Sequence, residues 1–334
     1  MDELSGAGIS ALCQLLGIRE SDLRRAKKQT RFVYVEKTII DKKSRKPRHL
    51  CYPRKESLLY QIQGQLKDKL LSRIPLLDEV RGYRPGSHNV STAALVCGRR
   101  SLGIVDFAQF HPSITARQVV DALVAHGLSY SWAREIARLV TYNDVVPQGA
   151  STSNHIANIV MDHFLREFVK PFADSLRVRF CNFGDDIAFF ANDHRAVEKC
   201  VRVTKRELRK SGFRVNNQKT RVYTHSGGPR CFLGCSTARN EPDYPREKYR
   251  AFRKELRELL YREQNRICAE PITSFKDICS IKQRIAYVKR LNPKKASRLR
   301  DLYFRILAAR RSEVCASYRK GPTEPPNVAG VPAR

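Results

Sequence analysis

The stretch that decides the fold is Cys181-Asn182-Phe183-Gly184-Asp185-Asp186-Ile187-Ala188-Phe189-Phe190. Residues 178–183 are rich in aromatic and β-branched side chains and residues 187–190 are apolar, so both segments are predicted to be β-strands. Gly184 can adopt the backbone of a tight turn. We therefore expect a β-hairpin with two adjacent carboxylates at its tip.

Adjacent carboxylates repel each other, so a positive group should hold Asp185 and Asp186. Mg²⁺ suits this tip, because it prefers carboxylate oxygens and keeps coordination positions open for phosphates. An ordinary solvated Asp-Asp turn is the alternative, since aspartate favours turns in any case. The pair alone does not separate the two interpretations.

Two further segments bear on that choice. Asp106 ends an apolar strand expected over residues 102–107, and a carboxylate buried at a strand end needs a partner. Residues 146–154 contain Pro-Gln-Gly and several small residues, which allow a ligand to approach the backbone, and a helix follows. Taken singly, Asp106 could be a strand-end cap and the Pro-Gln-Gly run a simple loop.

In this order, the motifs resemble the palm of a reverse transcriptase, in particular the bacterial retron and defence-associated group that also includes group II intron enzymes. The resemblance covers residues 10–310 and lies in segments 83–87, 106–114, 147–149, 212–221, 231–234, 285–289 and 292–296. It implies an α+β right-hand polymerase fold with fingers, a palm made of an antiparallel sheet backed by helices, and a helical thumb. The expected parts are a helical lead (1–30), fingers (31–100), palm (101–240, with finger and palm elements interleaved), helical thumb (241–320) and a disordered tail (321–334). The residue patterns predict an apolar face of the lead at Leu12, Leu15, Leu16 and Leu23 and a strand pair around a basic turn over residues 31–53. They also predict thumb helices over residues 246–260, 274–289 and 294–309.

The function implied by the resemblance is RNA-directed synthesis of cDNA from dNTPs by two-metal nucleotidyl transfer. The template would be a dedicated non-coding RNA in bacterial antiphage defence. Two Mg²⁺ ions, or Mn²⁺ in their place, would be bound by Asp106 and Asp185, with Asp186 supporting the cluster and the backbone carbonyl of Phe107 adding a ligand.

The resemblance also implies two sets of binding residues. Those expected around the incoming nucleotide are Lys46, Arg48, Phe110, His111, Gln148, Gly149 and, with a structural role as the alternative, Lys219. Those expected to contact nucleic acid are Arg84, Phe232, Leu233, Gly234, Lys289, Lys294, Lys295 and Arg298. A solvated basic surface is the simpler explanation for part of these cations.

Several positions depart from the family pattern. Gly184 stands where Ala or Met is usual, and Gly-Asp-Asp also occurs in RNA-dependent RNA polymerases. His111 occupies the position of the bulky aromatic gate that excludes the ribose 2′-hydroxyl, and the Val-Thr-Gly signature of retron members is replaced at residues 232–235. An RNA-making or relaxed-sugar polymerase therefore stays open, as does a non-catalytic RNA-binding scaffold.

Composition supports a polyanionic partner. The chain holds 63 Lys and Arg against 33 Asp and Glu, a net charge of +30, with a pI of about 10.1. No apolar run is long enough for a membrane helix and no secretory signal is evident, so we expect a cytoplasmic protein. The ten cysteines lack paired zinc-type spacing and are expected to be reduced. An effector protein or a second copy of the chain is a further candidate partner.

Overall fold

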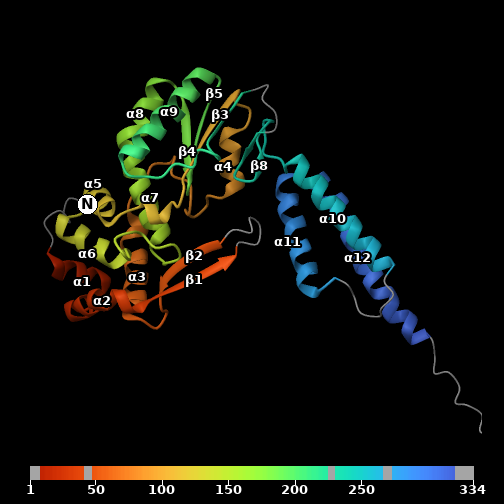
Figure 1. The fold of residues 1–334 in the computed structure, drawn as a ribbon, viewed down its shortest axis with the longest axis horizontal. Coiled ribbons are helices and arrows are strands. Elements are labelled where there is room, and N and C mark those ends of the chain that lie inside the picture. The colour runs from red at the N-terminus through yellow and green to blue at the C-terminus, as the bar shows by residue number, and fades with distance from the viewer. Residues whose placement is uncertain (1–7, 41–46, 225–229, 266–272, 320–334) are drawn as a thin grey trace, which may run out of the picture. The chain divides into compact units, whose positions relative to one another are not determined.

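The computed structural model describes residues 8–40, 47–224, 230–265 and 273–319, except for the side chains of Arg31 and residues 311–319. The chain divides into two compact units, Met1–Arg230 and Cys231–Arg334 (Figure 1). The expected tail at 321–334 lies outside the described residues. The boundaries expected at residues 30, 100 and 240 stay predictions.

The first unit begins with two helices, α1 (Ile9–Leu16) and α2 (Glu20–Val33). Gly17 adopts a φ of 70° and its N–H donates to carbonyls of the last turn, which ends α1. The helical lead is therefore broken in two. Leu12, Leu16 and Leu23 are buried, so the apolar face expected from the sequence packs into the core.

An antiparallel ribbon follows. It pairs β1 (Tyr34–Ile40) with β2 (Pro47–Pro53), as predicted for residues 31–53. The basic turn between these strands lies outside the described residues. After the ribbon, Ser57 caps α3 (Leu58–Lys69) by accepting a hydrogen bond from the N–H of Tyr60.

A four-stranded sheet forms the centre of the first unit. Its strands lie in the order β4-β5-β3-β6, and all of its pairings are antiparallel. The strands are β3 (Ser101–Asp106), β4 (Arg179–Phe183), β5 (Asp186–Ala191) and β6 (Arg221–Tyr223). The hairpin predicted from the quoted stretch is β4–β5.

Helices α4 (Asn89–Val96), α8 (Lys170–Ser175) and α9 (His194–Lys210) contact this sheet (Figure 1). The other described helices of this unit are α5 (Ala116–Ala125), α6 (Tyr130–Val140) and α7 (Ser153–Phe164), with the shorter η2 (Leu71–Arg73), η3 (His111–Ser113) and the π-helical η4 (Leu165–Val169). Helix α9 lies tightly on β3, because Gly103 has no side chain: a Cβ there would lie 2.4 Å from Val201 Cγ2.

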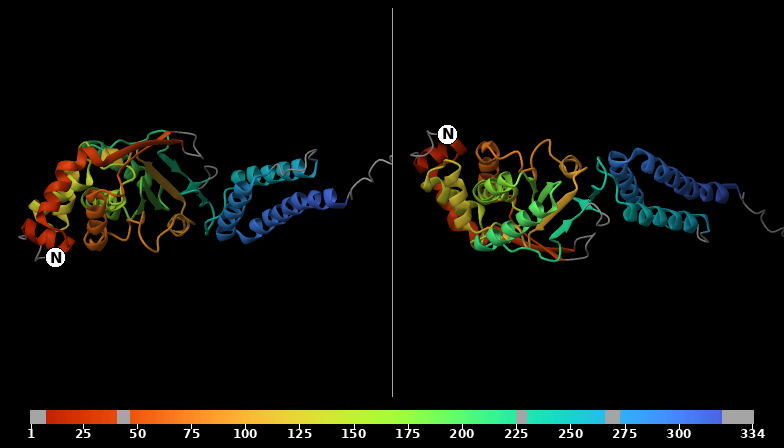
Figure 2. Two further views of the ribbon diagram at one scale, coloured as in Figure 1. Left: turned by 90° about the horizontal axis from the view of Figure 1, so that it is seen from below. Right: turned by 90° about the horizontal axis from the view of Figure 1, so that it is seen from above.

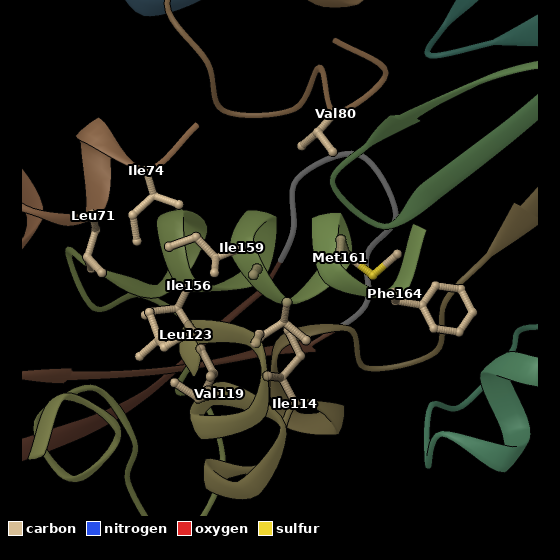
Figure 3. Close-up of a cluster of buried hydrophobic side chains, with 14 of the residues drawn as sticks. Leu71, Ile74, Val80, Ile114, Val119, Leu123, Ile156, Ile159, Met161 and Phe164 are labelled. Atoms are coloured by element: carbon tan, nitrogen blue, oxygen red, sulfur yellow. The ribbon is translucent and has the colours of Figure 1, made fainter. Parts of the chain in front are cut away.

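Helix α7 runs through the core of the first unit. Figure 3 shows its side chains Ile156, Ile159, Met161 and Phe164 between two groups of apolar residues. Ile114 and the α5 side chains lie on one side, and Leu71, Ile74 and Val80 lie on the other. The helix that carries the Pro-Gln-Gly loop at its start is therefore fixed by burial.

The second unit is a small hairpin followed by three helices (Figure 2). The elements are β7 (Cys231–Phe232), β8 (Cys235–Ser236), α10 (Arg246–Gln264), α11 (Phe275–Leu291) and α12 (Pro293–Arg319). Helix α12 packs against both α10 and α11 around its own apolar core, which includes Phe252, Leu256 and Leu299. The three helical segments predicted for the thumb are confirmed. Among the described residues, no helix is long and apolar enough to cross a membrane.

Candidate active site

The β4–β5 turn presents the paired aspartates. Phe183 pairs with Asp186, so only Gly184 and Asp185 form the loop. Gly184 has a φ of 61°, the left-handed backbone that a type II′ hairpin requires of its first loop residue. The buried side chain of Asn182 donates to the carbonyl oxygens of Gly184 (3.0 Å) and Asp186 (3.1 Å), which fixes the turn.

Strand pairing brings the third carboxylate to the same place. Asp106, the last residue of β3, lies directly opposite Asp186 in the β3–β5 ladder. One residue further, the N–H of Phe107 donates to the carbonyl of Asp185 at 3.0 Å. Three carboxylates that are up to 80 positions apart in the sequence therefore gather at one end of the sheet.

Burial makes the charges of Asp106 and Asp186 costly, whereas Asp185 is exposed. Asp106 is 5% exposed, and its Oδ1 has no hydrogen-bond partner within the described residues. Burial raises the pKa of Asp106, although Lys219 opposes that shift. Burial, followed by repulsion from Asp185 and Asp106, raises the pKa of Asp186 to about 7. The cluster therefore needs an external positive charge to be fully ionised at neutral pH.

Lys219 supplies part of that charge. Its Nζ lies 3.2 Å from Asp106 Oδ2, and its backbone N–H donates to Asn216 Oδ1. Asn216 in turn donates its own N–H to the Asp106 carbonyl at 2.8 Å. Lys219 therefore pairs with the buried aspartate in this arrangement, and both its expected nucleotide contact and the structural alternative stay predictions.

The carboxylates suit a hard divalent cation by their chemistry. Their oxygens are the ligands that Mg²⁺ prefers, and Asp106 Oδ1 is buried without a partner. As the side chains stand, no three His, Cys, Asp or Glu residues among those described converge closely enough to hold a metal. Lys219 pairs with Asp106 Oδ2, so a cation at that oxygen would compete with this ion pair.

A backbone segment behind the turn was not singled out from the sequence. The N–H of Asn182 donates to the Glu79 carbonyl and the N–H of Arg81 to the Asn182 carbonyl, both at 2.7 Å. Gly82 then passes so close that a Cβ on it would lie 2.4 Å from the nitrogen of Gly184. We call residues 79–84 the support strand.

Helix α7 and Arg84 hold the support strand. The buried Asn158 amide donates to the Gly82 carbonyl at 2.7 Å. Arg84 Nη1 donates to the carbonyls of Leu77 (2.9 Å) and Val80 (3.0 Å). Arg84, predicted to contact nucleic acid, therefore makes backbone contacts within its own loop.

Two features favour glycine at position 184, its φ of 61° and the nearby ring of Tyr83. With a φ of 55°, Tyr83 turns its ring onto the β4–β5 turn, and its Oη would lie 2.9 Å from a Cβ built on Gly184. An Ala or Met at position 184 would therefore require that ring to shift. Partial burial, followed by the charge of Asp185, raises the pKa of Tyr83, whereas Arg48 lowers it. Arg48, on β2, and Asp185, in the β4–β5 turn, therefore both act on Tyr83.

His111 lies next to Tyr83, with 6.4 Å between their ring centroids. Its Nε2 is 3.1 Å from Asn154 Oδ1, and its ring also contacts the buried Phe110, at 5.3 Å between centroids. Burial lowers the pKa of His111, so the imidazole is neutral at pH 7. The gate position thus carries a neutral ring anchored to α7.

The Pro-Gln-Gly loop meets the ribbon. The Gln148 carbonyl accepts a hydrogen bond from the N–H of Cys51 at 2.7 Å. Gly149 has a φ of 121°, and a Cβ on it would contact Tyr52 of β2 at 3.5 Å. Lys46 lies outside the described residues. The nucleotide-binding roles of these residues stay predictions.

The remaining predicted nucleic-acid contacts lie in the second unit. Phe232 is buried, and Leu233 and Gly234 form the β7–β8 turn with φ values of 48° and 81°. Lys295 Nζ is bound to Asp243 Oδ2 at 2.7 Å and to the Tyr244 carbonyl. Exposed side chains are those of Lys289, Lys294 and Arg298. Their contacts with nucleic acid stay predictions.

Comparison with known proteins identifies the class. Residues 40–237, more than half of the chain, match the family model described as "Reverse transcriptase (RNA-dependent DNA polymerase)". The chain therefore belongs to the reverse transcriptase family. This membership, together with the mixed helix-and-sheet architecture, confirms the expected right-hand polymerase fold.

Similar curated proteins are retron enzymes, which confirms the resemblance to bacterial retron-type reverse transcriptases. The chain is 28% identical over 278 residues to the Retron Mx65 reverse transcriptase of Myxococcus xanthus, with 78% of this chain and 62% of that protein covered. It is 25% identical to the Retron Se72 reverse transcriptase of Salmonella heidelberg (strain 579083-10), with 60% and 52% covered. The matched region is thus less than two thirds of either relative.

Telomerases are among the solved structures that match this chain. Telomerase from Candida albicans in complex with a TWJ fragment of telomeric RNA gives a TM-score of 0.48 at 11% identity, covering 90% of this chain and 65% of that one. Apo telomerase from Candida tropicalis gives 0.46 at 12% identity, covering 87% and 58%.

Proposed function

We propose that this protein is an RNA-directed DNA polymerase that makes cDNA from dNTPs. The observation that carries the proposal is the register of β3 against β5, which sets Asp106 opposite Asp186 beside the Asp185 turn in a chain of the reverse transcriptase family. Three carboxylates at one sheet end suit transfer of a nucleotidyl group to a primer 3′-hydroxyl.

Asp106, Asp185 and Asp186 would hold two Mg²⁺ ions, with the Phe107 carbonyl as a further ligand. When bound, Mg²⁺ supplies charge that stabilises the attacking and leaving oxygens of the transferred phosphoryl group. Residues of the chain would position the carboxylates and bind the nucleotide. Asn182 and the support strand fix the turn, and Arg48 and Lys46 would bind the triphosphate.

Lys219 has a place in this cycle. In the free protein the Lys219 ammonium group lies beside Asp106, where it supplies the positive charge that a divalent ion would supply. We propose that it leaves Asp106 when the divalent ion binds and then contacts the phosphates of the incoming nucleotide. The side chain of Lys219 is 63% exposed, so it is free to move from Asp106 to a bound nucleotide.

The test is primer extension with labelled dNTPs and Mg²⁺ on an RNA template. Asp185→Asn is expected to lower the rate by about a thousandfold or more, the equivalent of about 4 kcal/mol of barrier. Asp174→Asn is the matched control, because Asp174 is an exposed aspartate on α8 and the chemical change is the same. Equal rates for the wild type and Asp185→Asn would refute the proposal and favour the scaffold.

The choice of sugar is a second candidate function, favoured by one observation. The neutral His111 ring is smaller than the usual aromatic gate, so incorporation of ribonucleotides is expected to be measurable. Competing ATP against dATP on one template measures this selectivity. Equal incorporation of the two would mean that the protein is a relaxed-sugar polymerase.

We further propose a dedicated non-coding RNA as template and antiphage defence as the setting. This proposal is supported by the similarity to curated retron reverse transcriptases. Purifying the protein with its bound nucleic acid and sequencing both RNA and cDNA tests the template. Challenge with phage, in cells carrying the wild type or Asp185→Asn, tests the setting, and equal plaque counts would refute it. An effector protein that co-purifies would identify the partner.

A further inference from the structure

Helix α9 presents a stripe of cations on the solvent side of the central sheet. The exposed residues along this stripe are Arg195, Lys199, Arg202, Arg206 and Arg209. Successive members are three or four positions apart, so all five lie on one face of the helix. The opposite face is buried, with Val197 and Val201 against Gly103 of β3.

The protein neutralises this stripe only in part. Arg206 pairs with Glu207 at 2.7 Å, Arg209 donates to the amide oxygen of Asn217, and Lys199 lies over the Phe172 ring. Within the described residues, Arg195 and Arg202 have no carboxylate at ion-pair distance. An excess of positive charge therefore faces the solvent.

Only Arg209, in the last turn of α9, is a member of the stripe that the helix dipole favours. Like charges three and four residues apart destabilise a helix, and Arg195 adds a cation near the positive end of the helix dipole. A ligand that binds the stripe would remove both costs.

The side chains on α9 indicate which kind of polyanion fits the stripe. Unpaired bases need aromatic side chains on which to stack, and a lipid surface needs apolar side chains that insert into it. Among the described residues with large exposed apolar side chains, none lies on α9. The phosphate backbone of a base-paired nucleic acid needs neither feature, and duplex RNA is recognised mainly through its phosphates and shape.

We propose that the outer face of α9 binds the phosphate backbone of an RNA stem, separate from the primer and template at the catalytic turn. Asp106, Asp185 and Asp186 lie at the end of the sheet, whereas the stripe runs along the outside of the helix that covers its face. From Arg195 to Arg209 the stripe spans about 21 Å. This length is enough to reach several successive phosphates of one strand. The inference rests on the proposed function only in the choice of RNA as the polyanion.

The test compares two triple variants that remove the same charge. Arg195→Gln, Lys199→Gln and Arg202→Gln are combined on α9, and Arg24→Gln, Arg25→Gln and Lys28→Gln, all exposed, are combined on α2 as the control. The probe is a blunt RNA hairpin of about 16 base pairs. Its affinity is measured by fluorescence anisotropy over a range of KCl concentrations.

The α9 variant is expected to flatten the slope of log Kd against log salt by about 2 to 3, and the control by less than about 1. The single variant Arg202→Gln, with thermal melting as a check of folding, should flatten it by about 1. Equal losses in the two triple variants would overturn the proposal, because they would reflect net charge alone. Unchanged hairpin binding by the α9 variant, or loss only of binding to phosphatidylserine vesicles, would also overturn it.

Primer extension on saturating poly(rA)·oligo(dT) separates this inference from the proposed polymerase activity. Normal extension by the α9 variant with weakened hairpin binding is the expected result. Hairpin binding that weakens as expected in a protein without any extension supports the α9 site while refuting the polymerase. Normal extension with unchanged hairpin binding refutes the α9 site alone.

Discussion

The catalytic turn and helix α9 both gather like charges, yet the molecule treats the two clusters differently. At the turn Asp106 is buried and Asp186 is partly buried, so burial and repulsion raise the pKa of Asp186 to about 7, and Lys219 pairs with Asp106. On α9 the cations are exposed, and water and salt screen them. Burial, more than the number of charges, therefore decides whether a cluster responds to protons or to ionic strength.

Gly184→Ala is the change expected to disturb the catalytic turn most. Gly212→Ala, at the end of α9, is its matched control, because Gly212 also has a positive φ but a Cβ there meets nothing within 4 Å. Both substitutions strain the backbone by about 1–2 kcal/mol. Only Gly184→Ala also collides with Tyr83, so its extension rate is expected to fall by about a hundredfold.

The double variant Gly184→Ala with Tyr83→Phe checks the cause. Removing the Tyr83 hydroxyl eliminates the shortest contact and is expected to restore part of the extension rate. Primer extension and urea unfolding are measured together. Equal losses for Gly184→Ala and Gly212→Ala would show that backbone strain alone is responsible.

Metal-free stability should depend on pH through Asp186. Its pKa is raised from 3.8 to about 7, so between these values the folded protein holds a proton that the unfolded chain has released. Stability therefore falls as pH rises from 5 to 8, by about 2–3 kcal/mol. Urea unfolding in EDTA should show this fall in the wild type and a flatter profile in Asp186→Asn.

Mg²⁺ is expected to oppose that fall, since binding to the folded state at pH 8 restores stability. Urea unfolding of the triple α9 variant over the same pH range should match the wild type. The substituted α9 side chains are exposed, whereas Asp186 is partly buried. A wild-type profile that is flat in EDTA would contradict the burial argument for Asp186.

Substitutions at His111, the expected gate position, test how closely the residues around the paired aspartates are packed. His111→Tyr restores a bulky aromatic ring and is expected to raise the preference for dATP over ATP by about tenfold, a difference of about 1.4 kcal/mol. Asn154→Ala frees the imidazole from its anchor at 3.1 Å and should lower the preference. A selectivity that neither variant changes would show that another residue excludes the 2′-hydroxyl.

The smallest expected effect is on α9. Each like-charged pair costs a helix about 0.2–0.5 kcal/mol, and salt removes that cost. Raising KCl should therefore stabilise the wild type slightly and Arg202→Gln less, as measured by thermal unfolding at pH 8. An equal salt response in both proteins would show that the exposed stripe is already fully screened by water.

Local patterns sufficed to predict part of the fold and site. The β-rich runs around Gly-Asp-Asp predicted the β4–β5 hairpin, and the helical periodicity predicted α10, α11 and α12. Asp106 was chosen because it ends an apolar strand, and its place opposite Asp186 follows from pairing that no local pattern encodes.

The missed features depend on long-range contacts. Gly82 touches Gly184 and is held by Asn158, 76 positions away, so its role appears only when the chain is folded. The one available signal was a second glycine beside the Tyr-Arg-Pro-Gly run. The α9 stripe was missed for a different reason: its cations are spaced by helical turns and do not form a dense run in the sequence.

The contact between Tyr83 and Gly184 has a consequence for how this family diverges. A side chain at position 184 can grow only where the ring at position 83 shrinks or turns away. In relatives of this chain, an Ala or Met before the paired aspartates should therefore accompany a smaller residue, or a shorter loop, at the position of Tyr83. The two positions are expected to covary across the family although 100 residues separate them in this sequence.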